Sequence, residues 1–585
     1  MIYLMKTKFL VEKPNYQSAM TWAFILTLPL LVFLLSSSLL VQNGFVDTFF
    51  YTGYVHNYSD LLERYGRTYY SARLSFIYPE SVLVWWFGSK LGYCLFRYLL
   101  LSALLASIWK ISRTYFSNIF SVLFLIFVAF NLWLLRSLYY DYCDGTAIVY
   151  LITALHFLIS NYKSDVFRYI AAGLFYAMAT NCNLFALAIG GVFFPSWIIL
   201  QENKSIKGLL RKTGFIILGF SLWYFFLVLV TFLKFPQQNP FIEIAALQMV
   251  KQSLSEENIY WYSLGEVFAN NNYSVALIYP LFVLALSALF FLLNRNLNRD
   301  RLGIAVLLYL GTTIILYLVC HTVFKFAVIE WFYYFSYSMV ACFLVIMWLL
   351  GNISASLDLK HKKMLFVIFV IFYAIALGCS HLNTVQNAGV AILMPVFINL
   401  VIFVMIFLWA VHKNKILQAY LTFIVISLSP FFFLNPTYNL LSFTNHKSHA
   451  QIEWDVYKGS VQLQKWLTES LPPSVGTLKF WYKDDLMGRN GLFEKFSSIQ
   501  STLLWGGTRL SHMMKMPQLD GITQNNFVGL DYLVLLGNSL EEVQKGRVAI
   551  DQLFESYGKT HMEMIIHRKF VSDTLNYDIL ILKKI

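Results

Sequence analysis

Three aspartates lie next to long apolar runs, where a carboxylate is costly unless it has a role. Asp47 follows the first of these runs, at residues 20–41, by a few positions. Asp141 and Asp144 lie between two later runs, at 118–135 and 146–160. Ionisable residues at membrane depth are rare and mark functional sites. We therefore expect these three residues to be catalytic, each acting as a general base toward a hydroxyl or as a ligand of a divalent metal, Mg or Mn.

Basic and aromatic residues near the aspartates supply the groups that would hold a phosphate or a sugar. Arginine suits a phosphate because its guanidinium donates two parallel hydrogen bonds. Tyrosine hydroxyls and rings suit a sugar. The predicted substrate-binding residues are Tyr51, Arg64, Tyr70 and Arg73 in the segment after the first apolar run, with His321 and Lys325 in a later loop.

Each candidate also has a structural interpretation. Asp47 would cap the start of a loop. Asp141 and Asp144 would be a helix N-cap and a solvated loop charge, because an apolar run starts just after them. Arg73 would form an ion pair with Glu80 or extend to the membrane interface. The other basic candidates would belong to a solvated helix face or anchor the interface: Arg64, His321 and Lys325.

The composition is that of a membrane protein. The chain has 585 residues, of which 58% are hydrophobic and 13% are charged. A soluble domain carries about 25% charged residues. The formal net charge of +13 comes from short basic clusters between apolar runs. This pattern predicts membrane topology and gives no indication of nucleic-acid binding.

Runs long enough to cross a bilayer, which takes roughly 20 mostly apolar residues, recur along the first 435 positions. We expect an all-α polytopic bundle of about thirteen transmembrane helices. The predicted spans are 20–41, 93–109, 118–135, 146–160, 167–181, 183–200, 213–233, 273–293, 302–320, 333–350, 364–380, 391–411 and 416–434. The fifth and sixth are separated only by the polar turn Asn181-Cys182-Asn183.

The distribution of lysine and arginine predicts the orientation in an inner (plasma) membrane. With the N-terminus in the cytoplasm, most basic residues of the connecting segments fall on the inner side, as cytoplasmic loops require. An odd number of spans then places the C-terminal segment outside the cytoplasm. Residues 1–435 form the predicted membrane module, with a long first outer loop at 42–92.

The last 150 residues read as a separate small α/β domain, 436–585. Segments 477–482, 531–536, 562–566 and 577–583 have strand character. Ser539 and Glu542 have the spacing of a capping box, which predicts a helix that continues to about Tyr557. Since the chain ends outside the cytoplasm in the predicted topology, we expect this domain to be extracytoplasmic.

This arrangement resembles the GT-C superfamily of membrane glycosyltransferases. The resemblance rests on an outer loop that opens with Asp47, on a second acidic site at Asp141 and Asp144, and on the run at residues 69–79, YYSARLSFIYP. The number of spans and the C-terminal domain are similar to those of bacterial aminoarabinose transferases and oligosaccharyltransferases, and protein O-mannosyltransferases share the first-loop carboxylate. The Trp-Trp-Asp motif of oligosaccharyltransferases is absent, which argues against transfer to asparagine.

The resemblance implies a function for the site. Asp47 would activate the acceptor, and Asp141 and Asp144 would form the acidic site that binds a divalent metal in some members. The donor would be a sugar on a polyprenyl phosphate in the cell envelope, and the acceptor a lipid, a glycan or a protein. Three alternatives stay open: a polysaccharide polymerase or ligase, a transporter of envelope glycans, and a non-catalytic assembly protein whose C-terminal domain binds a partner.

Overall fold

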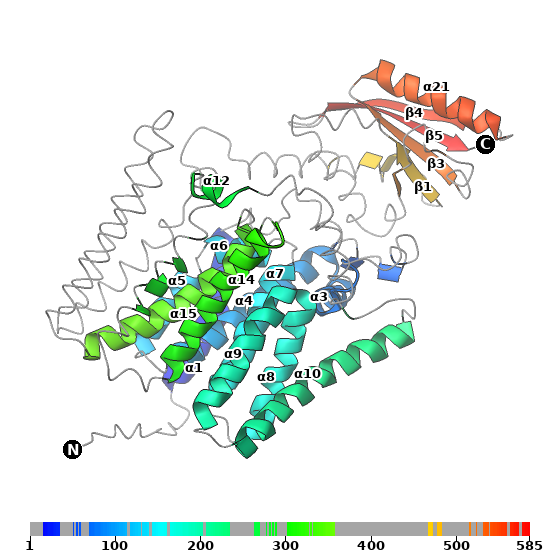
Figure 1. Cartoon of the computed structure of the whole chain (residues 1–585). Helices are drawn as coiled ribbons and strands as arrows, with labels where there is room; N and C mark the ends of the chain where they lie inside the picture. The colour runs from blue at the N-terminus through cyan, green and yellow to red at the C-terminus, as the bar shows by residue number, and fades with distance from the viewer. Residues whose placement is uncertain are drawn as a thin grey trace, which may run out of the picture.

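The molecule is a bundle of apolar helices followed by a small sheet domain, as a computed structural model shows (Figure 1). The structure describes residues 16–35, 70–113, 118–129, 132–139, 143–160, 164–202, 206–234, 262–269, 301–326, 332–356, 477–481, 530–537, 539–557, 562–571 and 576–584. It also describes shorter pieces, namely 51, 54, 55, 58, 59, 62, 241, 277, 280, 281, 283–285, 287, 288, 328, 329, 462, 466, 467, 469–471, 514, 515 and 522.

The described helices of the bundle follow the predicted apolar runs closely. They are α1 (Tyr16–Leu35), α4 (Ser89–Ser112), α5 (Asn118–Ala129), α6 (Leu132–Tyr139), α7 (Cys143–Ile159), α8 (Asp165–Cys182), α9 (Leu184–Glu202), α10 (Ile206–Lys234), α14 (Arg301–Thr322) and α15 (Phe332–Ser356). Two more helices, α3 (Leu74–Phe87) and α12 (Leu264–Ala269), fall in predicted outer segments. The predicted spans at 273–293, 364–380, 391–411 and 416–434 lie largely or wholly outside the described residues.

Three of the described helices are long and apolar enough to cross a membrane on their own. They comprise Leu91–Ser112, Ile206–Leu233 and Gly303–Thr322. Shorter apolar helices occur at Thr21–Leu31, Cys143–Ile159, Leu184–Leu200 and Ser336–Leu349. Almost every residue of α7 is buried, as expected for a helix that is apolar all round and lies at the centre of a bundle.

One predicted boundary was wrong, and it matters for the site. The run at 118–135 contains α5 and the start of α6, and residues 130 and 131 between them lie outside the described residues. The run at 146–160 begins earlier, at Cys143, so that Asp144 lies in the first turn of α7. Its side chain is fully buried, which corrects the interpretation of Asp144 as a solvated loop charge.

Glycines bring α8 and α10 into close contact. A Cβ atom on Gly173 would lie 2.0 Å from the carbonyl oxygen of Ile216, and one on Gly219 would lie 2.0 Å from that of Ile170. Each helix therefore contributes a glycine at the point where the backbone of the other approaches. Small residues serve this purpose in membrane helices, where packing rather than hydrophobic burial holds neighbours together.

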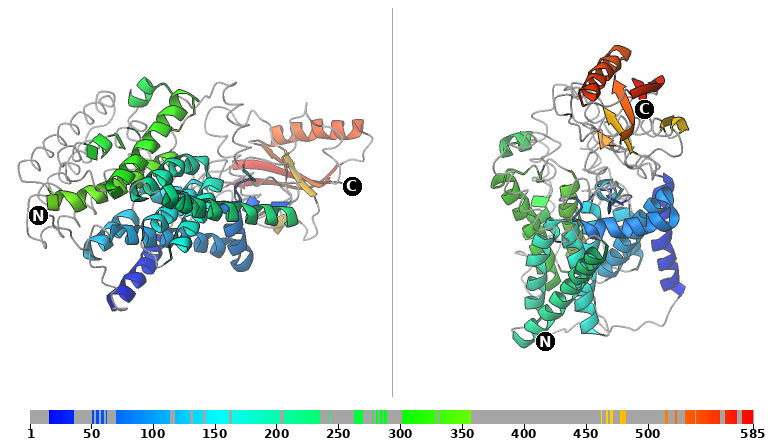
Figure 2. Two further views of the ribbon diagram at one scale, coloured as in Figure 1. Left: turned by 60° about the horizontal axis from the view of Figure 1, so that its bottom comes forward. Right: turned by 90° about the vertical axis from the view of Figure 1, so that its right-hand side faces the viewer.

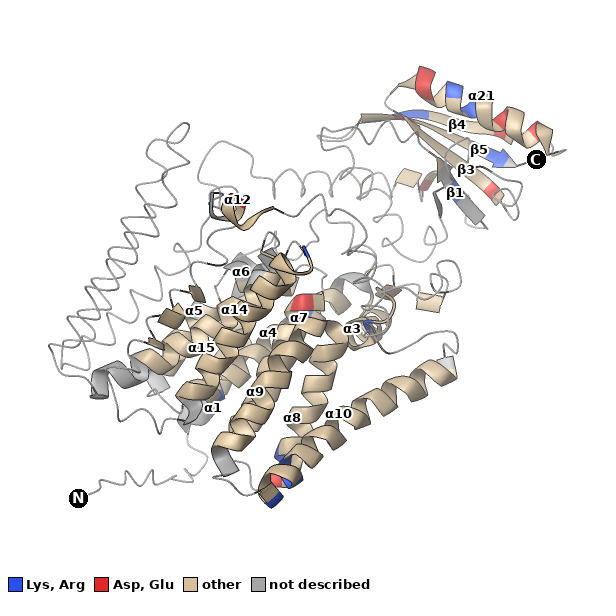
Figure 3. Ribbon diagram, in the orientation of Figure 1, with Lys and Arg blue, Asp and Glu red and all other residues tan. Residues whose placement is uncertain are grey.

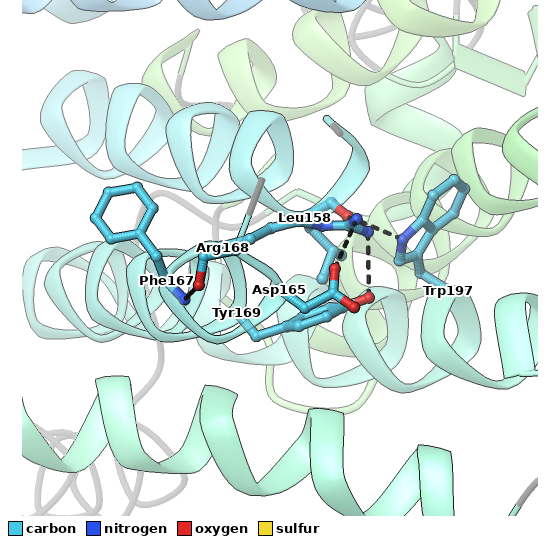
Figure 4. Close-up of polar contacts among 7 residues, drawn as sticks. Leu158, Asp165, Phe167, Arg168, Tyr169 and Trp197 are labelled. Carbon is cyan, nitrogen blue, oxygen red and sulfur yellow. Dashed lines mark hydrogen bonds and ion pairs between the residues drawn. The ribbon is translucent and has the colours of Figure 1, made fainter. Parts of the chain in front are cut away.

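A buried arginine fastens the end of the bundle where α7 ends and α8 begins (Figure 4). Arg168 donates from Nη2 to the carbonyl oxygen of Leu158 at 2.7 Å and to the Tyr169 hydroxyl at 3.1 Å, and it pairs with Asp165 at 3.6 Å. Trp197 donates to the same Leu158 carbonyl at 3.1 Å. Charged residues in the first turns of α8 and α10 gather at this end, away from the C-terminal domain (Figure 3).

Helix α3 runs across the other end of the bundle, on the side where the C-terminal domain lies (Figures 1 and 2). At 14 residues it is too short to span a bilayer. Its last residues, Trp85, Trp86 and Phe87, are exposed, as aromatic residues at a membrane interface would be.

A buried ion pair joins α3 to α4. Glu80 lies 3.6 Å from Arg97, and both side chains are almost fully buried. Burial raises the pKa of Glu80 to about 7, and the positive charge of Arg97 opposes that rise. The structural interpretation that paired Arg73 with Glu80 is therefore wrong, because α3 directs Glu80 toward α4.

The described part of the C-terminal domain is a five-stranded sheet with a helix packed on it. The strand order is β2-β1-β3-β5-β4, with β1–β2 and β1–β3 parallel and β3–β5 and β4–β5 antiparallel. The strands are β1 (Thr477–Trp481), β2 (Met514–Lys515), β3 (Leu530–Gly537), β4 (Met562–Val571) and β5 (Asn576–Lys584). Helix α21 (Leu540–Ser556) buries Val543, Ile550 and Phe554 in the same core as residues of β3 and β5.

The strands and the helix predicted for this domain are confirmed in place and order. The Ser539 hydroxyl accepts a hydrogen bond from the backbone N–H of Glu542 at 3.3 Å, which is the N-cap that the sequence predicted. Strand β2 and the further length of β4 were not predicted.

Candidate functional site

Arg73 begins helix α3 and is the cation of the candidate site. It occupies the N-cap position, and its side chain is 1% exposed. The guanidinium lies over the ring of Tyr51, 5.3 Å from its centroid, and Nη1 contacts the thiol of Cys143. A desolvated guanidinium on an aromatic face is held by about 2 kcal/mol. Its planar face and its direction are thus fixed by neighbours from two other segments.

Asp144 is the anion of the site. The Asn183 side-chain amide donates to Oδ1 at 2.6 Å, and the Cys143 thiol lies 3.8 Å from Oδ2. Tyr337, at the start of α15, lies beside the same carboxylate. Gly145 lets this turn of α7 reach α6, since a Cβ there would lie 2.1 Å from the carbonyl oxygen of Ser137.

Cys143 links the two charged groups. Its thiol contacts Arg73 on one side and lies 3.8 Å from Asp144 on the other, and the Tyr51 hydroxyl lies 3.8 Å from the same sulfur. Tyr70 packs edge-on against Tyr51 with ring centroids 5.4 Å apart. An arginine and a carboxylate are therefore held within one buried cluster, close enough for each charge to act on the other.

Residues 181–183, where α8 ends and α9 begins (the α8–α9 turn), support both charged groups. The Asn181 side chain accepts from the backbone N–H of Ser75 at 2.8 Å and donates to the carbonyl oxygen of Ala72 at 3.2 Å. The Asn183 side chain donates to Asp144 and accepts from the N–H of Phe185 at 2.9 Å, which caps α9. The sequence marked this turn as polar but did not predict that it reaches the site.

An aromatic group lines the side of the site formed by α9, α14 and α15. Phe185 lies 4.8 Å from Tyr334, 6.0 Å from Tyr317 and 6.1 Å from Tyr337, measured between ring centroids. His321 is fully buried on α14 and lies one turn beyond Tyr317, on the same face of the helix. This group extends the site from the Asp144 carboxylate toward the end of α14.

Lys325 is exposed and has a left-handed backbone conformation, with φ of 52°. Non-glycine residues rarely adopt this conformation. No described contact joins Lys325 or His321 to Arg73 or Asp144.

The structure brings together four of the predicted site residues: Tyr51, Tyr70, Arg73 and Asp144. The other acidic candidates, Asp47 and Asp141, lie outside the described residues, as does Arg64. Sequence reasoning missed Cys143, Asn181, Asn183 and Tyr337. The polar residues between two apolar runs were the signal for the two asparagines, whereas Cys143 and Tyr337 carried no local signal.

The metal prediction concerns Asp47, Asp141 and Asp144 together. Within the described part of the chain, no group of three or more His, Cys, Asp or Glu side chains has the arrangement of a metal site. Asp144 has an amide donor on one oxygen and a thiol near the other, so the described residues alone do not form a ligand set.

Comparison with solved structures shows the fold. No protein-family model and no curated protein matches the sequence. ArnT from Cupriavidus metallidurans in the apo state is similar over 96% of this chain and 98% of its own, with 10% identity and a TM-score of 0.53. ArnT bound to undecaprenyl phosphate gives the same coverage, 12% identity and a TM-score of 0.51.

The Archaeoglobus fulgidus oligosaccharyltransferase in the apo form matches 89% of this chain and 70% of its own, with 11% identity and a TM-score of 0.40. ArnT and this oligosaccharyltransferase are both GT-C membrane glycosyltransferases. The ArnT likeness shows the fold, a mostly helical bundle with a GT-C-like arrangement followed by a small C-terminal sheet domain.

Proposed function

We propose that this protein is a membrane glycosyltransferase that takes a sugar from a polyprenyl-phosphate-linked donor. The observation that carries the proposal is the buried pair of Arg73 and Asp144 at one end of a GT-C-like bundle. A guanidinium buried away from water favours the binding of an anion that is attached to an apolar chain. A polyprenyl phosphate is such an anion. The ArnT relative was solved with undecaprenyl phosphate bound.

The proposed reaction is a direct displacement at the anomeric carbon of the donor. The acceptor oxygen forms the new bond while the bond to the phosphate oxygen breaks, which inverts the configuration. Arg73 stabilises the negative charge that gathers on the leaving phosphate. A carboxylate removes the proton of the acceptor hydroxyl. Asp47 fits this role by its place in the sequence, and Asp144 orients the acceptor or shares the role.

The other candidates complete the proposed site. Tyr51 holds the guanidinium face, Tyr70 packs against Tyr51, and both would offer hydroxyls to the sugar. His321 would bind donor or acceptor from the aromatic side of the site. The remaining cationic candidates would help to bind the donor phosphate at the entrance of the site: Arg64 and Lys325.

We also propose the membrane topology that the sequence predicts. The N-terminus lies in the cytoplasm, and residues 436–585 form an extracytoplasmic domain on the 1–435 membrane module. Helix α3 runs across the bundle end that faces the sheet domain. The basic cluster at the opposite end of α8 and α10 supports a cytoplasmic location for that end. The site would then act in the outer leaflet of the inner membrane.

The test is release of undecaprenyl phosphate by the purified protein in liposomes, offered a panel of undecaprenyl-phosphate sugars and an envelope lipid, glycan or peptide acceptor. We expect acceptor-dependent release that falls at least about 100-fold in Asp47→Asn, the usual contribution of a general base. Full activity in Asp47→Asn would refute the role of this residue. Chain elongation on one acceptor would indicate a polymerase or ligase, and movement of a lipid-linked glycan without release would indicate a transporter.

A chelator series tests the metal prediction on the same assay. If Mg or Mn acts through Asp47, Asp141 and Asp144, release stops in chelator and returns when the metal is restored. Turnover that is unchanged in chelator would remove the metal role.

A further inference from the structure

Side chains of the α8–α9 turn contact both the segment that carries Arg73 and the carboxylate of Asp144. Asn181 and Asn183 are buried, 0% and 2% exposed, and they lie two residues apart. Two residues span at most about 7 Å, so the two contacts start from nearly the same place. Buried amides at the end of a helix hairpin are costly in an apolar setting unless their hydrogen bonds are made.

Asn181 holds the backbone on both sides of Arg73. Its oxygen accepts from the N–H of Ser75 at 2.8 Å, and its nitrogen donates to the carbonyl oxygen of Ala72 at 3.2 Å. The N–H groups in the first turn of a helix have no partner within that helix. One side chain therefore supplies a partner to the start of α3 and fixes the position from which the Arg73 side chain leaves the backbone.

Ser75 is held from two further directions. Its side-chain oxygen accepts from Trp223 at 2.8 Å, and its carbonyl oxygen accepts from Tyr150 at 3.3 Å. The residue that follows Arg73 by two positions is thus fixed by α7, α8 and α10 together. This makes the start of α3 a rigid support for a catalytic cation.

Asn183 holds Asp144 and both helices of the hairpin. Its backbone N–H donates to the carbonyl oxygen of Ala179 at 2.9 Å, at the end of α8. Its side-chain oxygen accepts from Phe185 at the start of α9, and its nitrogen donates to Asp144 at 2.6 Å. The amide that caps α9 is the same amide that orients the carboxylate.

We propose that the α8–α9 turn sets the spacing between the phosphate-binding cation and the carboxylate, with Asn181 positioning Arg73 and Asn183 positioning Asp144. The inference rests on the proposed function. A misplacement of about 1 Å in such a constellation costs on the order of 100-fold in rate. The two asparagines act on different steps, because one serves donor binding and the other serves the carboxylate.

Aspartate variants test the two asparagines separately. Asn181→Asp keeps the acceptor for Ser75 and loses the donor to Ala72. Asn183→Asp keeps the cap of α9, loses the donor to Asp144 and places a second carboxylate beside it. Thr180→Val is the matched control, since Thr180 precedes Asn181 on α8, is fully buried, and its hydroxyl makes no hydrogen bond to the described residues.

We expect Asn181→Asp to raise the KM for the lipid-linked donor about tenfold with kcat changed much less, the effect of one lost hydrogen bond on the placement of a charged group. Asn183→Asp lowers kcat at least about tenfold and leaves KM close to the wild-type value. Thr180→Val matches the wild type in both. If both aspartate variants match Thr180→Val, or if each changes KM and kcat alike, the proposal is wrong.

Amide hydrogen exchange tests the positioning by Asn181 independently of the proposed function. If the wild-type protein releases no undecaprenyl phosphate from any donor, the proposed function fails. The positioning by Asn181 is then decided by exchange in the segment 72–76. Faster exchange in Asn181→Asp than in Thr180→Val supports it, and equal exchange in the two variants overturns it.

Discussion

Replacing Arg73 with lysine tests how much the planar shape of the guanidinium, beyond its positive charge, contributes to phosphate binding. Lysine keeps the positive charge near Asp144 but lacks the planar face that lies 5.3 Å from the Tyr51 ring centroid. It also lacks the second nitrogen of the guanidinium fork, so it meets a phosphate as a point charge. Arg73→Lys should therefore retain the fold and weaken the binding of undecaprenyl phosphate.

The magnitude follows from the loss of one hydrogen bond to a charged group, which is worth about 1.5–3 kcal/mol. The dissociation constant should rise roughly 10- to 150-fold. Ligand at one hundred times the wild-type Kd stabilises a folded protein by about 2.7 kcal/mol. At that same concentration the lysine variant should be stabilised by about 1.4 kcal/mol at the lower limit and by about 0.3 kcal/mol at the upper limit.

Thermal unfolding of the detergent-solubilised protein with and without undecaprenyl phosphate measures this difference. Arg168→Lys is the matched control, because Arg168 is also buried and also lies over a tyrosine ring, at 4.7 Å from the centroid. It contacts Leu158, which lies about 20 Å along α7 from Asp144. The control should lose basal stability but keep the full ligand-induced shift. An unchanged ligand shift in Arg73→Lys, or an equal loss in both variants, would refute the reasoning.

Three further predictions concern other groups in the structure. Asp144→Asn should slow release of undecaprenyl phosphate at least about 100-fold and tighten its binding, because a negative charge is removed; weaker binding would contradict this. Burial raises the pKa of Glu80 from 4.5 to about 7, so the stability linked to this group is fully present below pH 4.5 and is lost as the pH rises through 7. Melting curves of Glu80→Gln should lack this dependence, and an equally steep fall in the variant would contradict it. Gly145→Ala would place a Cβ 2.1 Å from the Ser137 carbonyl oxygen, and it should destabilise the protein by about 1–3 kcal/mol, whereas Gly311→Ala, which meets open space, should be close to neutral.

The elements could be predicted because each depends on local signals. Long apolar runs require helices in a bilayer, and the described helices follow them. The cap at Ser539 and the strand pattern around it are likewise local, and they placed α21 and the strands beside it.

The partners within the site could be predicted only in part, because helix packing decides which side chains meet. Arg73 and Asp144 were candidates by residue type, but nothing local indicated that Cys143 lies between them. Glu80 was assigned to the wrong arginine, since Arg73 is nearer in sequence while α3 turns Glu80 toward Arg97. The polarity of Asn181 and Asn183 was visible in the sequence, and only the structure shows which groups they hold.

Locating bound undecaprenyl phosphate in an experimentally determined structure of the protein would test the central claim most directly. The proposed function requires the phosphate within hydrogen-bond distance of the Arg73 guanidinium, on the side of the site that contains Asp144. A phosphate bound elsewhere, for example at the end of the bundle held by Arg168, with Arg73 still enclosed by Tyr51 and Cys143, would contradict it.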